Sequence, residues 1–436
     1  MKPGKWLQTT MVLTLAAVML LAGCGSNSNE EGSGGTTTSA AETAETNSGP
    51  VEITYWNLFG GGEGDFADQI VKNFNDSQSE IVVKALRLES NEYYAKLGTA
   101  LASGKGPDVA IAHVDKIAPF VKANQLAALD EPAAKAGFDY ADVTDSNAQS
   151  VVYDGKHYAV PIDTHFHMLY YNKDLLDKAG LLTADGLPNL GDVSPEGFKN
   201  FLTELKNKLP DIEPFAVNVP YFHEPFYNLY YEAGGDLLNA DNTQAAINND
   251  KALQVLNFYL DLFDSKLSDV NDKTPWQTFH DGKAALWFGG VWEAGWHFGE
   301  QNLNVGAMPL PPIFGSEQHW GSSHTLVVPA YVDPAKQEAA LKFAKYYILE
   351  GGKIWGQAGH VPAGKAVVSS DEYKNLPYRK YFIEAQKTVK FAPKTDKYNA
   401  IDTSIQEVLQ NIVFKKVTPQ EGLGIMEKEI NDILAN

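Results

Sequence analysis

The sequence predicts an α/β protein with two lobes, each built on a mainly parallel β-sheet flanked by helices. Two observations lead to this prediction. Runs with the apolar spacing of strands alternate with runs that have the spacing of helices, and this alternation favours a parallel sheet covered on both faces. The chain also has 436 residues, whereas domains tend to divide beyond about 250 to 300 residues.

The segment after residue 50 begins with alternating strands and helices. Its strands are predicted at 51–56, 81–88 and 108–112, and its helices at 66–75 and 93–102. In the first of these helices, phenylalanine and isoleucine recur at four-residue spacing on one face. The order is strand, helix, strand, helix, strand, as a parallel sheet requires.

Later helices are predicted from their end signals. Ser-Pro-Glu at 194–196 supplies an N-cap, a first-turn proline and a first-turn acid. Asp-Pro at 333–334 opens another helix, and two glycines at 351–352 are expected to end it. A mostly helical final segment carries an apolar stripe of Ile401, Ile405, Leu409 and Ile412.

The N-terminus has the layout of an export signal. Two lysines begin the chain, an uncharged and mostly apolar run fills 11–22, and small residues precede Cys24. The run is shorter than the roughly 20 residues of a membrane span, so a cleaved signal peptide is predicted at 1–23. Leu-Ala-Gly-Cys at 21–24 resembles the lipobox of bacterial lipoproteins, which implies that the Cys24 sulfur carries a lipid. An ordinary unpaired cysteine of a secreted protein is the alternative.

Residues 24–50 are predicted to be a disordered linker that follows the lipid anchor. From Gly25 onward the segment contains no valine, isoleucine, leucine, methionine or aromatic residue, so it cannot bury enough apolar surface to order itself. As a flexible coil it would reach about 30 Å.

The charge of the chain argues against two classes of partner. Acidic residues outnumber basic ones by 55 to 35, and the formal net charge is −20. Nucleic-acid binding needs clustered lysine and arginine. An anionic membrane surface would repel a protein with this net negative charge.

Six segments, taken in order, resemble family 1 extracellular solute-binding proteins, the maltose-binding-protein-like receptors of ABC importers. No single segment is specific, but the combination is. The segments are ITYWNLFGGGEGDFADQIVKNFN (53–75), LGTALASGKGPDVAIAH (97–113), YAVPIDTHFHMLYYNKDLLDKAGL (158–181), FHDGKAALWFGGVWEAGW (279–296), NVGAMPLPP (304–312) and GHVPAGKAV (359–367).

The resemblance implies a periplasmic-binding-protein-like fold with a ligand cleft between two lobes. The chain is expected to cross between lobes near Asp163 and near 322–325. The N-terminal lobe would then comprise 51–162 and 326–370, and the C-terminal lobe 163–325 and 371–436.

The resemblance also implies a function. The protein would bind a sugar, an oligosaccharide, and deliver it to the permease subunits of an ABC transporter. It would be a monomer without enzymatic activity or cofactor, anchored through Cys24 to the outer face of the bacterial cytoplasmic membrane.

Candidate ligand contacts lie in turns that follow strands. Open α/β sheets bind ligands beyond the carboxyl ends of their strands, so the turns after 56 and 112 and around 163 should form one rim. The glycine-rich turn at 57–64 lacks the lysine and serine or threonine of a P-loop and the spacing of a dinucleotide site. By resemblance, this turn contributes Asn57, Phe59 and Glu63, although helix capping is an alternative role for Glu63.

Tryptophans between 276 and 320 provide the stronger signal. Their indoles stand beside glycine-rich turns, where they can stack on the apolar faces of sugar rings. Trp287, inside the apolar run AALWF, is expected in the core instead. The ligand-stacking candidates are Trp276, Trp292, Trp296 and Trp320.

Polar candidates follow from the resemblance and from their positions near the rim. Asp115 and Asp163 are favoured as ligand contacts, while surface acids or structural histidines are the alternatives for the others. The set is His113, Asp115, Asp163, His165, Glu224, Ser323, His324 and His360.

Two other functional classes are alternatives to a sugar receptor. A glycoside hydrolase would need two carboxyl groups at a set separation, and the chain has no GxSxG motif. A receptor for a non-sugar solute such as a polyamine or a metal is a further alternative. His-Phe-His at 165–167 prompts the metal hypothesis, but the sequence shows no HExxH motif or clustered set of further ligands, so His167 is interpreted as a packing residue.

Overall fold

The structure, a computed structural model, describes residues 49–88, 90–299 and 303–436. The predicted signal peptide at 1–23, the predicted lipid attachment at Cys24 and all but the end of the linker lie outside the described residues. Within this part of the chain, no helix is long and apolar enough to cross a membrane.

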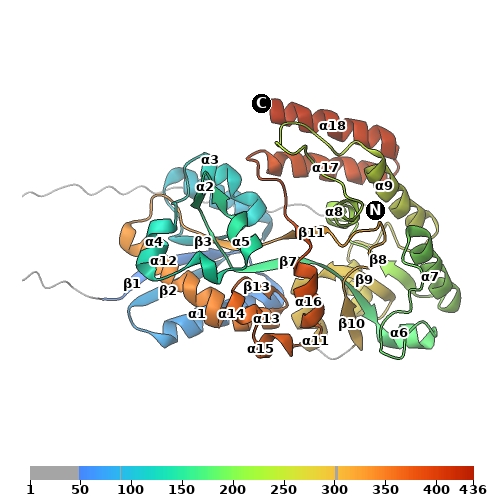
Figure 1. Ribbon diagram of the computed structural model, residues 1–436, viewed down its shortest axis with the longest axis horizontal. Helices are drawn as coiled ribbons and strands as arrows, with labels where there is room; N and C mark the ends of the chain where they lie inside the picture. Colours follow the sequence, from blue (N-terminus) through green and yellow to red (C-terminus); the bar gives the residue numbers. More distant parts are fainter. Residues whose placement is uncertain (1–48, 89, 300–302) are drawn as a thin grey trace, which may run out of the picture. The chain divides into compact units, whose positions relative to one another are not determined.

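The first β-sheet contains the three strands that were predicted at 51–56, 81–88 and 108–112 (Figure 1). Its strands are β1 (Val51–Asn57), β2 (Ile81–Arg87), β3 (Val109–His113), β6 (Val160–Pro161) and β12 (His324–Val327). Their order is β2-β1-β3-β12-β6, with β1 parallel to β2 and β3, and β12 antiparallel to β3 and β6. Helices α1 (Gly61–Ser77) and α2 (Ser90–Ser103) connect the first three strands, which confirms the predicted alternation.

The second sheet is built around one long buried strand. Its strands are β7 (Asp163–Asn172), β8 (Glu213–Ala216), β9 (Ala284–Gly290), β10 (Val305–Met308), β11 (His319–Ser322), β13 (Val361–Pro362) and β14 (Val389–Lys390). The order is β14-β11-β7-β9-β8, and β10 and β13 also pair with β7. Every residue of β7 is buried.

The expectation of mainly parallel sheets is wrong for the second sheet. Its pairings β8–β9 and β11–β14 are parallel, but β7 is antiparallel to β9, β10, β11 and β13. The reason is the path of the chain. Strand β7 leads away from the first sheet and β11 leads back to it, so these two neighbours must run in opposite directions.

The chain crosses between the sheets at the two predicted places. It leaves β6 of the first sheet at Pro161 and enters β7 at Asp163, and it leaves β11 at Ser322 and enters β12 at His324. The predicted lobe limits themselves stay predictions. Strand β12 begins two residues before the predicted limit at 326, and β13 lies within the predicted range 326–370 although it pairs with the second sheet.

The glycines at 351–352 do not end a helix as expected. Helix α12 (Pro334–Tyr346) is capped by Asp333 as predicted, but a π-helical turn (Tyr347–Gly351) leads directly into α13 (Gly352–Ala358). Gly351 has a φ of −61°, which is ordinary helical backbone. A Cβ there would lie 2.9 Å from Ile70 Cγ2, so this glycine permits close packing against α1 instead of a turn.

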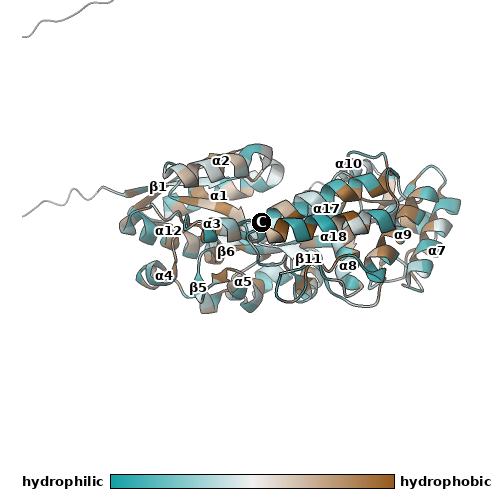
Figure 2. Cartoon of the chain, turned by 90° about the horizontal axis from the view of Figure 1, so that it is seen from above, coloured by the Kyte–Doolittle hydropathy of each residue, from teal (hydrophilic) through white to brown (hydrophobic). Residues whose placement is uncertain are grey.

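Helices of the second lobe pack around its largest apolar core. They include α7 (Pro195–Lys208), α8 (His223–Glu232), α9 (Asp250–Asp264), α17 (Tyr398–Val413) and α18 (Pro419–Ala435). Ser194 caps α7 as predicted, accepting a hydrogen bond from the Gly197 amide at 3.1 Å. The predicted stripe on α17 is confirmed, because all four of its side chains are buried. Figure 2 shows hydrophilic and hydrophobic residues alternating along α17 and α18, as amphipathic helices require.

Candidate ligand-binding site

A cavity of about 480 Å³ lies where the two sheets meet. Its lining includes the turn after β1, the turn after β3, the start of β7 and the end of β11. Helices α8 and α17 of the second lobe complete it. The prediction that the turns near 56, 112 and 163 form one rim is therefore confirmed.

The predicted site residues fall into three groups. One group lines this cavity: Phe59, Glu63, His113, Asp115, His165, Glu224, Trp292, Trp320 and His324. Trp276 and Trp296 line a second hollow of about 790 Å³, which shares Gly60, Glu63 and Trp292 with the first. Asn57, Asp163, Ser323 and His360 are buried behind the lining, where the sequence analysis expected direct ligand contact.

Aromatic rings cluster on the second-lobe side of the cavity. The His167 ring stacks against Trp320 with centroids 5.3 Å apart, and it meets Trp292 edge-on at the same centroid distance. The His165 ring lies 5.8 Å from Trp292. A Cβ at Gly290 would come within 2.1 Å of the Trp292 indole, so only glycine lets this indole fold back over the strand end.

Two further tryptophans lie in the second hollow, and one lies in the core. Trp276 and Trp296 have centroids 5.8 Å apart, and Trp296 stacks on His280 at 3.6 Å. Trp287 is only 2% exposed, which confirms the expected core position. Its indole donates a hydrogen bond to Glu293 Oε2 at 2.6 Å.

Asp115 is held in its charged form at the mouth of β3. Ser322 donates a hydrogen bond to Asp115 Oδ1 at 2.9 Å, and Lys116 Nζ lies 3.2 Å from Oδ2. Burial alone would raise the pKa of Asp115, but the positive charge of Lys116 and smaller contributions from His113 and Ser322 outweigh it, so the pKa lies below its usual value. Asp115 is therefore a hydrogen-bond acceptor at the cavity surface.

Glu224 on α8 is paired in a similar way. His167 Nε2 lies 3.3 Å from Glu224 Oε2, and His167 Nδ1 lies 3.1 Å from the Asn228 amide. Burial acts to raise the pKa of Glu224, but the hydrogen bond and charge of His167 lower it further than burial raises it. His167 is thus a buried hydrogen-bonding residue, more than the packing residue that the sequence analysis expected.

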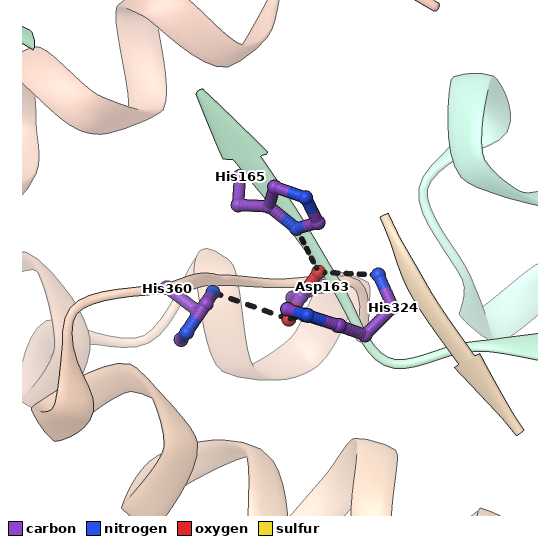
Figure 3. A group of neighbouring side chains, drawn as sticks. All are labelled: Asp163, His165, His324 and His360. Carbon is purple, nitrogen blue, oxygen red and sulfur yellow. Dashed lines mark hydrogen bonds and ion pairs between the residues drawn. The ribbon is translucent and has the colours of Figure 1, made fainter. Parts of the chain in front are cut away.

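Asp163 is the centre of a buried network (Figure 3). Its Oδ1 accepts a hydrogen bond from the His324 amide at 2.9 Å and lies 3.2 Å from His165 Nδ1. Its Oδ2 lies 2.8 Å from His324 Nδ1 and accepts from the Trp355 indole at 2.7 Å. His360 Nδ1 is 3.2 Å from the same oxygen.

The network shifts the pKa values of its members in opposite directions. Burial would raise the pKa of Asp163, but the facing histidines hold it well below the usual range. Burial lowers the pKa of His324, but attraction to Asp163 reverses this and leaves the pKa raised. Burial and repulsion from His324 lower the pKa of His165 to about 4. His324 is therefore the ring that shares a proton with Asp163, while His165 stays neutral.

Among the described residues, Glu63 makes no side-chain capping hydrogen bond to α1, and its contact with a ligand stays a prediction. It lies in the first turn of α1, and it lines both hollows. Its Oε1 is 2.6 Å from His360 Nε2, so it also connects the lining to the Asp163 network behind it.

Asn57 and Ser323 shape the walls from behind. Asn57 Oδ1 accepts a hydrogen bond from the Phe59 amide at 3.3 Å and so fixes the turn that presents Phe59. The Ser323 carbonyl accepts from the Val114 amide at 2.8 Å, which ties the second crossing to the turn after β3.

Several lining residues were not predicted from the sequence. Asp402 on α17 accepts a hydrogen bond from the Tyr227 hydroxyl at 3.0 Å and lies 3.9 Å from Lys116. The sequence contains a signal for this residue, because Asp402 is an acid next to the apolar stripe of its helix. The other unpredicted side chains in the lining include Tyr94, Lys116, Tyr221, His223, Tyr398 and Gln406.

Comparison with known proteins gives a consistent family match. The sequence model of the bacterial extracellular solute-binding protein family matches residues 69–380. The chain is 25% identical over 319 residues to the maltodextrin-binding protein MdxE of Bacillus subtilis, covering 70% of this chain and 72% of that protein. It is 26% identical over 373 residues to the diacetylchitobiose binding protein DasA of Streptomyces coelicolor, covering 82% of each.

A solved structure shares the fold. The GacH receptor of Streptomyces glaucescens, determined without ligand and with acarbose, matches at a TM-score of 0.78 and 24% identity, covering 89% of this chain and 99% of that chain. The two-lobed α/β class expected from the sequence is thereby confirmed.

Proposed function

This chain belongs to the bacterial extracellular solute-binding protein family, and from that premise we propose that it binds an oligosaccharide and delivers it to an ABC transporter permease. One observation supports the sugar most strongly. Indoles and hydrogen-bonding groups border the same cavity, as the indole of Trp292 and the carboxylate of Asp115 do. The apolar face of a sugar ring packs on an indole while its hydroxyls bond to fixed polar groups.

The pairing of the carboxylates favours a neutral ligand. Asp115 is paired with Lys116, whereas Glu224 and Glu63 lie within hydrogen-bonding distance of His167 and His360. A polyamine would need carboxylates without cationic partners, and an anion would need unpaired cations. Hydroxyl groups can add hydrogen bonds to these carboxylates without bringing a further charge into the cavity.

The second hollow favours a ligand of more than one ring. Trp292 and Glu63 line both hollows, and Trp276 and Trp296 lie in the second. A chain of sugar rings that starts in the cavity could therefore continue past Trp292. The relatives named for maltodextrin and diacetylchitobiose are consistent with a ligand of this kind.

The proposed mechanism is closure around the ligand. The lining comes from both sheets, which meet at the two crossings, so a sugar would contact both lobes at once and favour the closed state. The permease could then distinguish loaded from empty receptor. The proposal also includes the lobe limits expected from the resemblance, 51–162 with 326–370 and 163–325 with 371–436. It further includes export of the protein as a monomer anchored by lipid on Cys24.

A thermal-shift screen against mono- and oligosaccharides tests the function. At a ligand concentration one hundred times Kd, binding adds about 2.7 kcal/mol to the stability of the folded state, which raises the melting temperature measurably. Trp276→Ala should leave the shift by the shortest active sugar unchanged and reduce the shift by longer ones, because Trp276 lines only the second hollow. A melt that responds only to polyamines or metals, or release of reducing ends from the bound sugar, would contradict the proposal.

A further inference from the structure

Four buried side chains with metal-binding atoms converge behind the cavity. One ligand atom from each of Asp163, His165, His324 and His360 can be chosen so that all lie within 4.8 Å of one another. The residues come from the start of β7, the start of β12 and the segment before β13 (Figure 3). The sequence does not reveal these partners of His165, because His324 and His360 are distant from it along the chain.

His360 supplies an independent observation. Its Nε2 lies 2.6 Å from Glu63 Oε1, and a carboxylate at that distance fixes the ring proton on Nε2. The other ring nitrogen, Nδ1, faces Asp163 Oδ2 at 3.2 Å and is buried without a hydrogen bond. The two carboxylates that flank this ring require positive charge there, which a second ring proton or a metal ion on Nδ1 can supply.

We propose that Asp163, His165, His324 and His360 bind a divalent transition-metal ion, for which Zn²⁺ is the best match. Three imidazole nitrogens and one carboxylate oxygen form a ligand set that suits Zn²⁺, whereas Ca²⁺ and Mg²⁺ prefer oxygen ligands. The contact from Glu63 to His360 is the carboxylate–histidine–metal arrangement found around such ions. The Trp355 indole orients Asp163 in the same way.

Binding requires small and defined changes. Zinc bonds of about 2.0 to 2.2 Å place tetrahedral ligands roughly 3.5 Å apart, so the most distant pair must approach by about 1 Å. The hydrogen bonds from His165 and His324 to Asp163 are replaced by bonds to the metal, and each Nδ1 proton moves to Nε2 or leaves. His165 and His324 also line the cavity, which gives the ion a path inward.

The position of the site suggests its effect. Its ligands belong to both sheets and flank the two crossings, so a bound ion would tie the lobes together beneath the cavity floor. Glu63 contacts His360 and also lines the cavity, so it would connect the bound ion to the cavity lining. This inference does not rest on sugar binding, because the ion and the sugar would occupy different positions.

Calorimetric titration of Zn²⁺ into the full-length protein, first stripped of metal by a chelator and free of sugar, tests the proposal. One equivalent should bind, and Co²⁺ should give the visible absorption of a tetrahedral site. His360→Gln should weaken Zn²⁺ binding by about 100-fold or more, and Glu63→Gln by about 10- to 100-fold as an outer partner. His157→Gln should bind Zn²⁺ like the wild type, because it removes a histidine that is paired with Asp130 and does not belong to the cluster.

The variants must melt cooperatively to be compared. A folded wild type that binds no stoichiometric Zn²⁺, or a folded His360→Gln variant that binds it like the wild type, would overturn the site. Either result leaves the sugar proposal untouched, because the sugar screen measures a different ligand.

Discussion

Asp163 shows what single residues contribute and what a sequence can say about them. The sequence predicts Asp163, His165, His324 and His360 as separate ligand contacts, whereas the structure joins them in one buried network. Asp163 and His324 are 161 residues apart, and only the two crossings bring them together. Residue types at a turn predict chemistry, but their convergence depends on the fold of the whole chain.

Glu232, at the end of α8, is a second buried acid with a consequence for stability. It is 5% exposed, and its Oε1 accepts a hydrogen bond from the Phe314 amide. Burial raises the pKa of Glu232 to about 8, and the hydrogen bond only partly opposes this. The folded state therefore holds this proton more tightly than the unfolded chain, where a glutamate has a pKa of about 4.3.

Glu232→Gln should remove a pH-dependent loss of stability. Because the folded-state pKa is raised, the proton's contribution is present below pH 4.3 and is lost progressively as the pH rises to about 8. The variant keeps an acceptor for Phe314 and has no ionisation penalty, so it should exceed the wild type by roughly 3 to 5 kcal/mol above pH 8 and match it near pH 4.5. Urea unfolding at both pH values measures this difference.

Glu204→Gln provides the matched control, because Glu204 is an exposed acid paired with Lys208. Its effect should be small at both pH values. An equal change in stability for Glu232→Gln at pH 4.5 and above pH 8 would contradict the role assigned to its ionisation.

At the scale of elements, helix N-caps and apolar spacing predicted helices and strands reliably. Glycine was ambiguous, because it can either end a helix or permit close packing within one. The early strands and helices and the Ser194 cap could be predicted because their causes are local. The glycines at 351–352 could not be interpreted locally, because close approach of Ile70 requires the first of them. The acid Asp402 could not be predicted as a lining residue either. Its place beside the apolar stripe of its helix indicates burial, but it does not indicate what the carboxylate faces.

Two glycines of α18 allow a sharp test of this distinction. A Cβ at Gly424 would meet nothing within 4 Å, whereas one at Gly422 would lie 2.4 Å from Ile412 Cδ1. Gly424→Ala should therefore stabilise the protein by about 0.5 to 1 kcal/mol through helix propensity. Gly422→Ala should destabilise it by about 1 to 3 kcal/mol through overpacking. Urea unfolding of both variants measures these changes, and the same sign for both would contradict the packing of α17 against α18.

For the molecule as a whole, the architecture was predictable and the details of the sheets were not. Length indicated two lobes, and the resemblance located both crossings, but the antiparallel environment of β7 followed only from the path of the chain. That path also places α17, near the C-terminus, against a cavity lined by segments from both halves of the chain, among them the turn after β1 and the end of β11. The site therefore exists only where the two sheets come together.

The account depends most on Trp292 from one lobe and Asp115 from the other contacting the same sugar. Calorimetric titration of the oligosaccharide found by the screen into Trp292→Ala and Asp115→Asn tests this directly, with Phe414→Ala as a control for loss of an aromatic side chain that is 46% exposed. Each site variant should bind at least about 10-fold more weakly, equivalent to about 1.4 kcal/mol, while the control binds like the wild type. Wild-type affinity in either folded site variant would contradict a single cavity shared by both lobes.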